Sequence, residues 1–176
     1  MPDAPGLELI RGEIERDRPG AVLATSYDRA QAALLVDPAR ILEVLRWLSE
    51  QPGHRYDFLS SLHAADYLPA APRFGVHYEL INRDRVERVR VKAMLSDPGH
   101  EELPEIDSCV ELFPTADAQE REAYDFFGIV FAGHPDLRRI LMPEDYVGWP
   151  QRRDFPIGGE PVLYTHNEIE APRWFE

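Results

Sequence analysis

The chain has 176 residues, enough for one compact domain with a substantial core, because a chain of about 150 residues buries roughly 70% of its unfolded surface. Its 32 acidic and 19 basic residues give a formal net charge of −13, which opposes the phosphate contacts on which nucleic-acid binding depends. The same charge would repel an anionic bilayer, so we expect any attachment to a membrane to run through another protein.

The beginning of the chain does not resemble a targeting segment. Residues 1–6 have neither the basic start nor the apolar stretch of a signal peptide. No apolar run in the sequence approaches the roughly 18 to 20 residues that a membrane span requires. We therefore expect the protein to stay in the cytoplasm.

The first fifty residues predict two helices and a hairpin. Apolar residues at helical spacing predict a short helix over residues 7–16. Two short apolar runs, 21–27 and 31–36, flank a polar turn and predict the hairpin. Asp37-Pro38 then supplies an N-cap with proline at the first helical position, which predicts a core helix that ends at Pro52-Gly53.

Three strands are predicted next, and they complete the fold class. Residues 56–62 have the composition of a strand, and residues 74–80 and 89–93 alternate apolar with polar side chains around a turn at 82–84. The alternation predicts an antiparallel hairpin with one covered face. The order of elements predicts an α+β fold: a two-layer sandwich with a mainly antiparallel sheet, helices on one face and an irregular C-terminal ribbon.

The sequence argues against several kinds of catalytic or redox site. It holds no G-x-G-x-x-G or G-x-x-x-x-G-K-[ST] phosphate loop, and His100-Glu101 does not continue into H-E-x-x-H because residue 104 is proline. Cys109 is the only cysteine, whereas an iron–sulfur cluster needs about four thiolate ligands. We therefore expect that this chain alone builds no redox metal centre.

Residues 128–176 form an unusual segment. Up to residue 161, glycine and proline come so often that no helix longer than about two turns fits between them. The segment is nonetheless too apolar for a disordered linker, so it must bury itself against its own domain, against a partner protein, or against both. We therefore treat residues 1–127 as the α+β domain and residues 128–176 as an extended interface segment of the same structural unit.

A helix predicted from Asp117 to Gly128 carries a carboxylate, Glu120, on its apolar face. A half-buried carboxylate without a partner would cost several kcal/mol. Two kinds of partner are open: the backbone amide of Asp117, in a capping box, or the guanidinium of a later arginine. The candidate arginines are Arg138, Arg139, Arg152 and Arg153.

These arginines form two adjacent pairs, each flanked by an aspartate and by apolar residues. Paired arginines beside aromatic rings suit RNA stacking, phosphate capture or a protein interface. Four nearby acids balance the four positive charges, and this neutrality favours protein contacts over phosphate. The acids are Asp136, Glu144, Asp145 and Asp154.

Three ordered stretches resemble the signature of one family. They are EREAYDFFGI at residues 120–129, Phe131 with GHPDLRRILMP at 133–143, and GWPQRRDFP at 148–156. Together these stretches resemble the C subunit of NADH-quinone oxidoreductase, which is respiratory complex I. The resemblance extends over roughly residues 56 to 164.

The resemblance implies a structural subunit in the peripheral arm of a proton-pumping NADH:quinone oxidoreductase, packed against a partner like the D subunit of that complex near the quinone site. It implies no cofactor in this chain, since flavin, iron–sulfur clusters, NADH and quinone would belong to partner subunits. It also implies a peripheral location on the cytoplasmic side of the cell membrane, attached through the complex. The implied structural and interface residues are Glu120, Arg121, Glu122, Asp125, Gly128, Gly133, His134, Pro135, Asp136, Arg138, Arg139, Arg152, Arg153 and Asp154.

Other readings of the sequence remain. Trp149 stands where the family usually has histidine and is similar to photosynthetic relatives of complex I, so the alternative is the equivalent subunit of a ferredoxin-linked complex or an energy-converting hydrogenase. A metal-dependent hydrolase built on His134 and Asp136 is a third reading, although a lone His-Pro-Asp in a loop is more often a turn. We also expect the apolar terminus at Trp174-Phe175 to dock on a partner.

Overall fold

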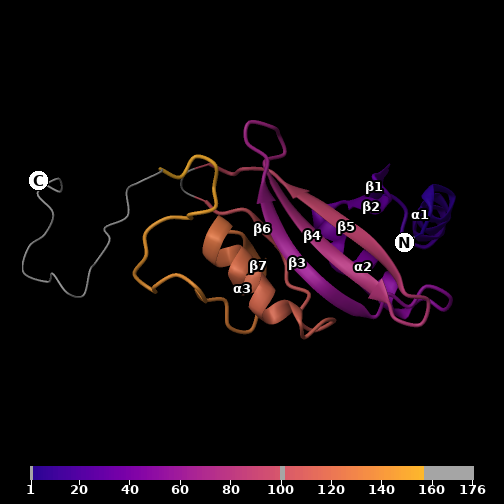
Figure 1. Ribbon diagram of the computed structural model, residues 1–176. Helices are drawn as coiled ribbons and strands as arrows, with labels where there is room; N and C mark the ends of the chain where they lie inside the picture. The colour runs from indigo at the N-terminus through magenta and orange to yellow at the C-terminus, as the bar shows by residue number, and fades with distance from the viewer. Residues whose placement is uncertain (1, 100–101, 157–176) are drawn as a thin grey trace, which may run out of the picture.

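The computed structural model describes residues 2–99 and 102–156 of the chain (Figure 1). The helices are α1 (Ala4–Asp17), α2 (Ile41–Glu50) and α3 (Ala116–Phe127), with a 3₁₀ turn at Pro38–Arg40. The strands are β1 (Val22–Asp28), β2 (Gln31–Val36), β3 (Phe58–Asp66), β4 (Phe74–Asn82), β5 (Glu87–Leu95), β6 (Glu105–Asp107) and β7 (Val130–Ala132). The terminus at Trp174-Phe175, expected to dock on a partner, lies outside the described residues.

Five of these strands form one sheet in the order β1-β2-β5-β4-β3, and every neighbouring pair is antiparallel except β2 and β5. The parallel pair arises because the chain leaves the first hairpin, crosses through α2 to β3 at the far edge, and returns through β4 and β5. Figure 1 shows α2 behind the sheet and α3 beside β3. Side chains from all three helices join one apolar core with the sheet. The predicted α+β class is therefore confirmed.

The N-terminal half follows its local sequence signals closely. The turn of the first hairpin has Arg29 and Ala30 at positive φ, the backbone that a two-residue hairpin loop requires. The Asp37 side chain accepts a hydrogen bond from the Ala39 amide at 3.1 Å, so the predicted cap exists. It caps the 3₁₀ turn, and the α-helix proper begins only at Ile41.

Strand β4 departs from the predicted pattern because it is buried on both faces. Its apolar side chains face the core, while His77 and Glu79, on the other face, are each only 6% exposed. The Arg90 side chain reaches across from β5 to Glu79, and the Tyr67 hydroxyl lies 3.0 Å from His77 Nε2. Long polar side chains from neighbouring segments thus cover the middle strand without a second layer of helices.

A second, two-stranded sheet places the start of the predicted ribbon inside the domain. Strands β6 and β7 pair in parallel, with Ile106 opposite Phe131. The side chains of Ile129 and Phe131 are buried in the core. Strand β7 therefore lies within the segment predicted at residues 128–176, and the part of that segment without strands begins after Ala132.

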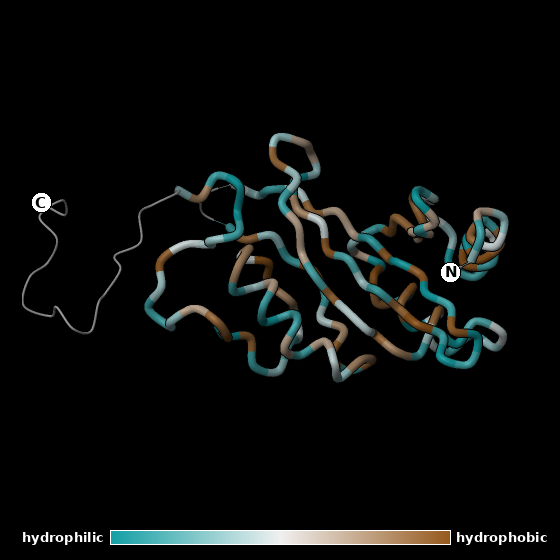
Figure 2. The backbone as a smooth tube through the Cα atoms, viewed as in Figure 1, coloured by the Kyte–Doolittle hydropathy of each residue, from teal (hydrophilic) through white to brown (hydrophobic). Residues whose placement is uncertain are grey.

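Figure 2 shows how apolar and polar residues alternate along the strands of the sheet. The buried apolar side chains of β4 and β5 belong to the core, whereas Ile81 and Met94, on the opposite face of the sheet, are only half-buried. Over the described parts of the chain, none of the helices combines the length and the apolar character needed to cross a bilayer.

Candidate functional site

Residues 133–156, called the ribbon below, lie against α3 and the end of the sheet. Helix α3 prepares this contact because it turns Ala123 and two carboxylates, Glu120 and Asp125, inward. The helix ends at Gly128, whose φ of 67° is the left-handed conformation that glycine adopts at low cost. A Cβ at Gly128 would lie 2.5 Å from the Trp149 ring, so glycine also lets the ribbon pack closely on the helix.

Neither partner proposed for Glu120 from the sequence is the one it has. Its buried carboxylate accepts hydrogen bonds from the Ser108 hydroxyl at 2.6 Å and from the Cys109 amide at 2.8 Å. The side chain turns toward the loop before α3, so it reaches neither the Asp117 amide nor an arginine. Burial raises the pKa of Glu120, and the two hydrogen bonds partly oppose that shift. The group fastens residues 108–109 to the helix.

Asp125 is the first anchor of the ribbon. One of its oxygens accepts hydrogen bonds from three successive amides, those of Ile140, Leu141 and Met142, at 3.1, 2.7 and 2.8 Å. The other oxygen accepts from Arg139 Nη1 at 2.8 Å. Burial alone would raise the pKa of Asp125, but these donors hold it below its usual range.

Arg139 ties two distant parts of the ribbon together. Besides its contact with Asp125, its Nη2 donates to the Gly148 carbonyl at 2.8 Å. The guanidinium lies 4.6 Å from the centre of the Trp149 ring and 5.6 Å from that of Tyr146. The side chain is only 11% exposed. Arg139 therefore works inside the ribbon as an internal brace.

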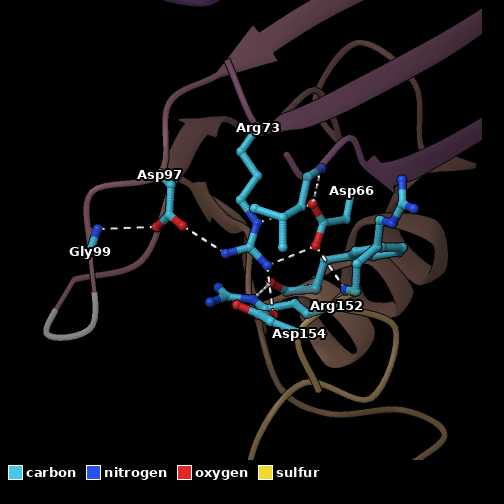
Figure 3. A network of polar contacts seen from close by, with 9 residues as sticks. Asp66, Arg73, Asp97, Gly99, Arg152 and Asp154 are labelled. Atoms are coloured by element: carbon cyan, nitrogen blue, oxygen red, sulfur yellow. Dashed lines mark hydrogen bonds and ion pairs between the residues drawn. The ribbon is translucent and has the colours of Figure 1, made fainter. Parts of the chain in front are cut away.

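A second anchor holds the end of the ribbon on the sheet (Figure 3). Arg73, at the start of β4, donates to Asp66 at 2.8 and 3.0 Å, to Asp97 at 2.7 Å and to Asp154 of the ribbon at 2.6 Å. Asp66 also accepts from the Arg153 amide at 2.9 Å. Although burial opposes it, the Arg73 guanidinium and two backbone amides lower the pKa of Asp66 to about 2.

Arg152 completes the second contact from the ribbon side. Its Nε donates to the Phe127 carbonyl at 2.7 Å, and its guanidinium lies over the rings of Phe74 and Trp149. Burial, together with the neighbouring charge of Arg73, lowers the pKa of Arg152. The ribbon is thus fastened at both the C-terminal end of α3 and the edge of the sheet.

Between these anchors, residues 140–147 form what we call the arch. The Tyr146 amide donates to the Pro143 carbonyl at 3.1 Å, which closes a turn with Glu144 and Asp145 at its tip. Apolar side chains flank the tip and face solvent: Ile140 is 38% exposed, Leu141 61% and Val147 89%. The arch therefore presents apolar side chains on a backbone that is held in place.

The implied site residues divide into buried and exposed sets. Glu120, Asp125 and Gly128 are buried, Arg121, His134, Arg139 and Arg152 are half-buried, and the exposed residues are Glu122, Gly133, Pro135, Asp136, Arg138, Arg153 and Asp154. The Arg121 guanidinium donates to the carbonyls of Arg138 and Arg139. The Arg138 side chain forms an exposed ion pair with Asp136, at 2.9 Å. Glu122 borders a shallow hollow between α3 and β3.

The geometry of His134 does not fit the metal-hydrolase reading. Its Nδ1 accepts a hydrogen bond from the Asp136 amide at 3.0 Å, so His-Pro-Asp forms a turn. Its Nε2 lies 3.2 Å from the Asp117 carbonyl and donates to it. Both ring nitrogens are therefore occupied by the backbone. Among the described residues, no group of three metal-ligating side chains gathers elsewhere.

Sequence reasoning missed the second anchor. Asp66, Arg73 and Asp97 lie at the ends of strands, and no motif connects them with Asp154, which is 81 residues from Arg73. Charged residues at the junction of a strand and a loop were the available signal. They are common at such places, so only the fold identifies these three.

The fold defines the class of protein first. A chain in the structure of the membrane-bound sulfane sulfur reductase, described as an archaeal respiratory membrane complex, has the same fold with a TM-score of 0.68. The match covers 94% of this chain and 97% of that one at 22% sequence identity. This chain is therefore an α+β domain of a type that also occurs in a respiratory membrane complex.

Sequence comparison then identifies the family. The family described as "Respiratory-chain NADH dehydrogenase, 30 Kd subunit" matches residues 34–161. The C subunit of NADH-quinone oxidoreductase from Roseiflexus castenholzii is 45% identical over 90% of this chain and 89% of the relative. The protein of the same name from Roseiflexus sp. is 40% identical over 96% and 92%. The chain belongs to this family, as the resemblance implied.

Proposed function

We propose that this chain is a structural subunit of a respiratory membrane complex of the NADH-quinone oxidoreductase type and that it attaches to its neighbours through the ribbon. One observation carries the proposal. Asp125 fixes three successive backbone amides of the arch, while the side chains of Leu141 and Val147 project into solvent. Exposed apolar side chains on a fixed backbone suit docking on another protein.

The same proposal includes the finer assignment implied by the sequence. The chain packs in the peripheral arm against a partner like the D subunit near the quinone site, on the cytoplasmic side of the membrane, in a complex that pumps protons. The names of its relatives and its net charge of −13 support a peripheral attachment through protein.

In this proposal the chain carries no cofactor of its own, and flavin, iron–sulfur clusters, NADH and quinone reside in partner subunits. The single thiol supports this view, because Cys109 is fully buried. Burial and the neighbouring Glu120 also raise the pKa of the Cys109 thiol, which disfavours the thiolate that a cluster needs.

The test is a pull-down from native membranes. We expect the tagged chain, expressed from its own promoter and purified in mild detergent, to bring down a D-like subunit and other peripheral-arm subunits. The chain purified alone should be colourless and without redox activity. A tagged chain that fractionates with membranes but recovers none of these subunits, or a visible flavin or cluster spectrum in the pure chain, would contradict the proposal.

A second candidate is the equivalent subunit of a ferredoxin-linked complex or of an energy-converting hydrogenase. Trp149 favours it: the residue that departs from the usual family pattern packs on Gly128 and Arg139 at the centre of the ribbon. Mass spectrometry of the intact complex separates the candidates. NADH-binding subunits support the first and hydrogenase or ferredoxin-binding subunits support the second.

A further inference from the structure

The arch has a fixed shape before any partner arrives. Asp125 holds Ile140, Leu141 and Met142 through their amides, and Arg139 joins that region to the Gly148 carbonyl. Hydrogen bonds thus hold both ends of the arch, and the turn between them is closed by a further hydrogen bond, so the backbone of the arch has little conformational freedom. Binding through the arch therefore costs little conformational entropy, which is how preorganisation raises affinity.

The exposed side chains of the arch combine two chemistries. Leu141 and Val147 flank the turn and are apolar and solvent-facing. Glu144 and Asp145, at the tip, form no ion pair with any other described residue. The other ribbon aspartates differ, because Asp136 and Asp154 pair with Arg138 and Arg73. The tip thus carries two unbalanced negative charges between apolar side chains.

We propose that the arch enters an apolar pocket on a neighbouring protein subunit whose rim carries lysine or arginine side chains; this inference rests on the proposed function. Leu141 and Val147 occupy the pocket, and Glu144 and Asp145 pair with the rim. Burying two carboxylates against a neutral surface would leave them uncompensated, so a basic rim is the complementary surface.

The charge of the chain argues against two other occupants. A second copy of this chain also carries a formal net charge of −13, so its surface would on balance repel the acidic tip. An anionic bilayer repels the tip for the same reason. A different protein with local positive charge is therefore the occupant that the described residues fit.

The apolar part is tested by comparing two leucines of nearly equal exposure. Leu141→Gln changes the arch, and Leu9→Gln changes the outer side of α1, where the leucine is 63% exposed. Membranes from cells that lack the chain are incubated with each purified variant, and the bound fraction is measured against concentration. We expect Leu141→Gln to weaken binding by about tenfold or more and Leu9→Gln to leave it within about twofold.

The charged part is tested by reversal. Glu144→Lys with Asp145→Lys is compared with Glu50→Lys with Glu111→Lys, which changes the net charge equally at exposed acids outside the ribbon. We expect the arch pair to weaken binding by about tenfold at low salt and the control pair by much less. The difference should shrink as ionic strength rises, because the Debye length falls from about 30 Å at 0.01 M to about 3 Å at 1 M.

The outcomes separate the inference from the proposed function. If the wild-type chain binds the depleted membranes but the arch variants behave like their controls, the inference is wrong and the proposed function stands. If the wild-type chain does not bind at all, the proposed function fails. Dimerisation lost in Leu141→Gln, or sedimentation of the pure chain with phosphatidylglycerol vesicles, would instead assign the arch to a second copy or to a bilayer and overturn the inference.

Discussion

Asp125 shows how one side chain can set the course of a long segment. The ribbon backbone has no neighbouring strand to accept its hydrogen bonds here. The Asp125 carboxylate takes that role, because it accepts hydrogen bonds from three backbone amides that would otherwise face partly apolar surroundings. The fourth donor, Arg139, brings a compensating charge. A carboxylate with this many donors is stable when buried, and that is why the ribbon needs no regular secondary structure here.

Asp125→Asn should destabilise the chain by about 3 to 5 kcal/mol, because it leaves Arg139 without its charged partner and places an NH₂ group against backbone donors. Urea denaturation measures the loss. Hydrogen exchange at the amides of residues 140–142 should speed up in the same variant. Asp136→Asn is the control, since that exposed pair should contribute less than about 1 kcal/mol. Equal stability of the two variants would refute the role of Asp125.

His77 makes stability depend on pH at the scale of one residue. Burial, with the charges of His63 and Lys92, lowers the pKa of His77 to about 3, whereas an unfolded histidine titrates near 6.5. Between these pH values the unfolded chain takes up a proton that the folded chain does not. The contribution of His77 to the free energy of unfolding is therefore complete above about pH 6.5 and is lost as the pH falls.

We therefore expect His77→Gln to reduce the slope of unfolding free energy against pH by up to about 1.4 kcal/mol per pH unit between pH 4 and 6. Denaturant titrations of the wild-type chain and of His77→Gln at several pH values give the two slopes to be compared. An unchanged slope in His77→Gln would mean that the imidazole is not kept neutral by the fold.

At the scale of elements, the end of α3 positions the ribbon. Gly128 ends the helix, and the Trp149 ring packs directly against it. One glycine therefore both turns the chain and leaves room for the ribbon to pack on the helix. Gly133 also has a positive φ, of 82°, but nothing lies within 4 Å of the place where its Cβ would be. The two glycines thus separate the cost of backbone conformation from the cost of close packing.

Gly128→Ala should lower the free energy of unfolding by about 1 to 3 kcal/mol more than Gly133→Ala does. Both substitutions strain a backbone with positive φ, but only the first places a methyl group against the Trp149 ring. Thermal or urea unfolding gives the comparison. Near-ultraviolet circular dichroism should also change in Gly128→Ala as Trp149 is displaced. Similar losses in both variants would show that Trp149 does not rest on this glycine.

At the scale of the whole molecule, the ribbon adds a preorganised contact surface to a small domain. Its two anchors come from separate parts of the sequence: Asp125 from α3, and Asp66 with Arg73 from the sheet. Neighbouring arginines in the ribbon have different tasks for this reason. The Arg139 side chain is only 11% exposed and braces the ribbon, whereas that of Arg138 is 63% exposed and remains open to a partner.

Alanine substitution of these neighbours should separate folding from assembly. Arg139→Ala should lower the free energy of unfolding by about 2 to 4 kcal/mol, because it removes charge-assisted hydrogen bonds of a buried group. Arg138→Ala should leave stability within about 0.5 kcal/mol and reduce the amount of assembled complex. Denaturation of the free chain and native gels of solubilised membranes are the two measurements. Normal assembly with a destabilised Arg138→Ala chain would reverse the assignment.

The sequence by itself determined the features that depend on near neighbours. The α+β class, the first hairpin, the cap at Asp37 and the end of α3 at Gly128 follow from local periodicity and from residues that favour particular backbone angles. The family signature within residues 120–156 is equally local, and the comparisons confirmed the family that it indicated. The interface role of the individual signature residues remains a prediction.

Only the tertiary structure decided which charged groups meet. Glu120 faces Ser108 and Cys109, Asp125 binds Arg139, which was one of four candidate partners for Glu120, and Arg73 reaches an aspartate 81 residues away. The chain has 32 acids and 19 bases, so many pairings satisfy the same local pattern. The choice among them depends on where the core places each backbone, because desolvation makes an unpaired buried charge far more costly than an unpaired exposed one.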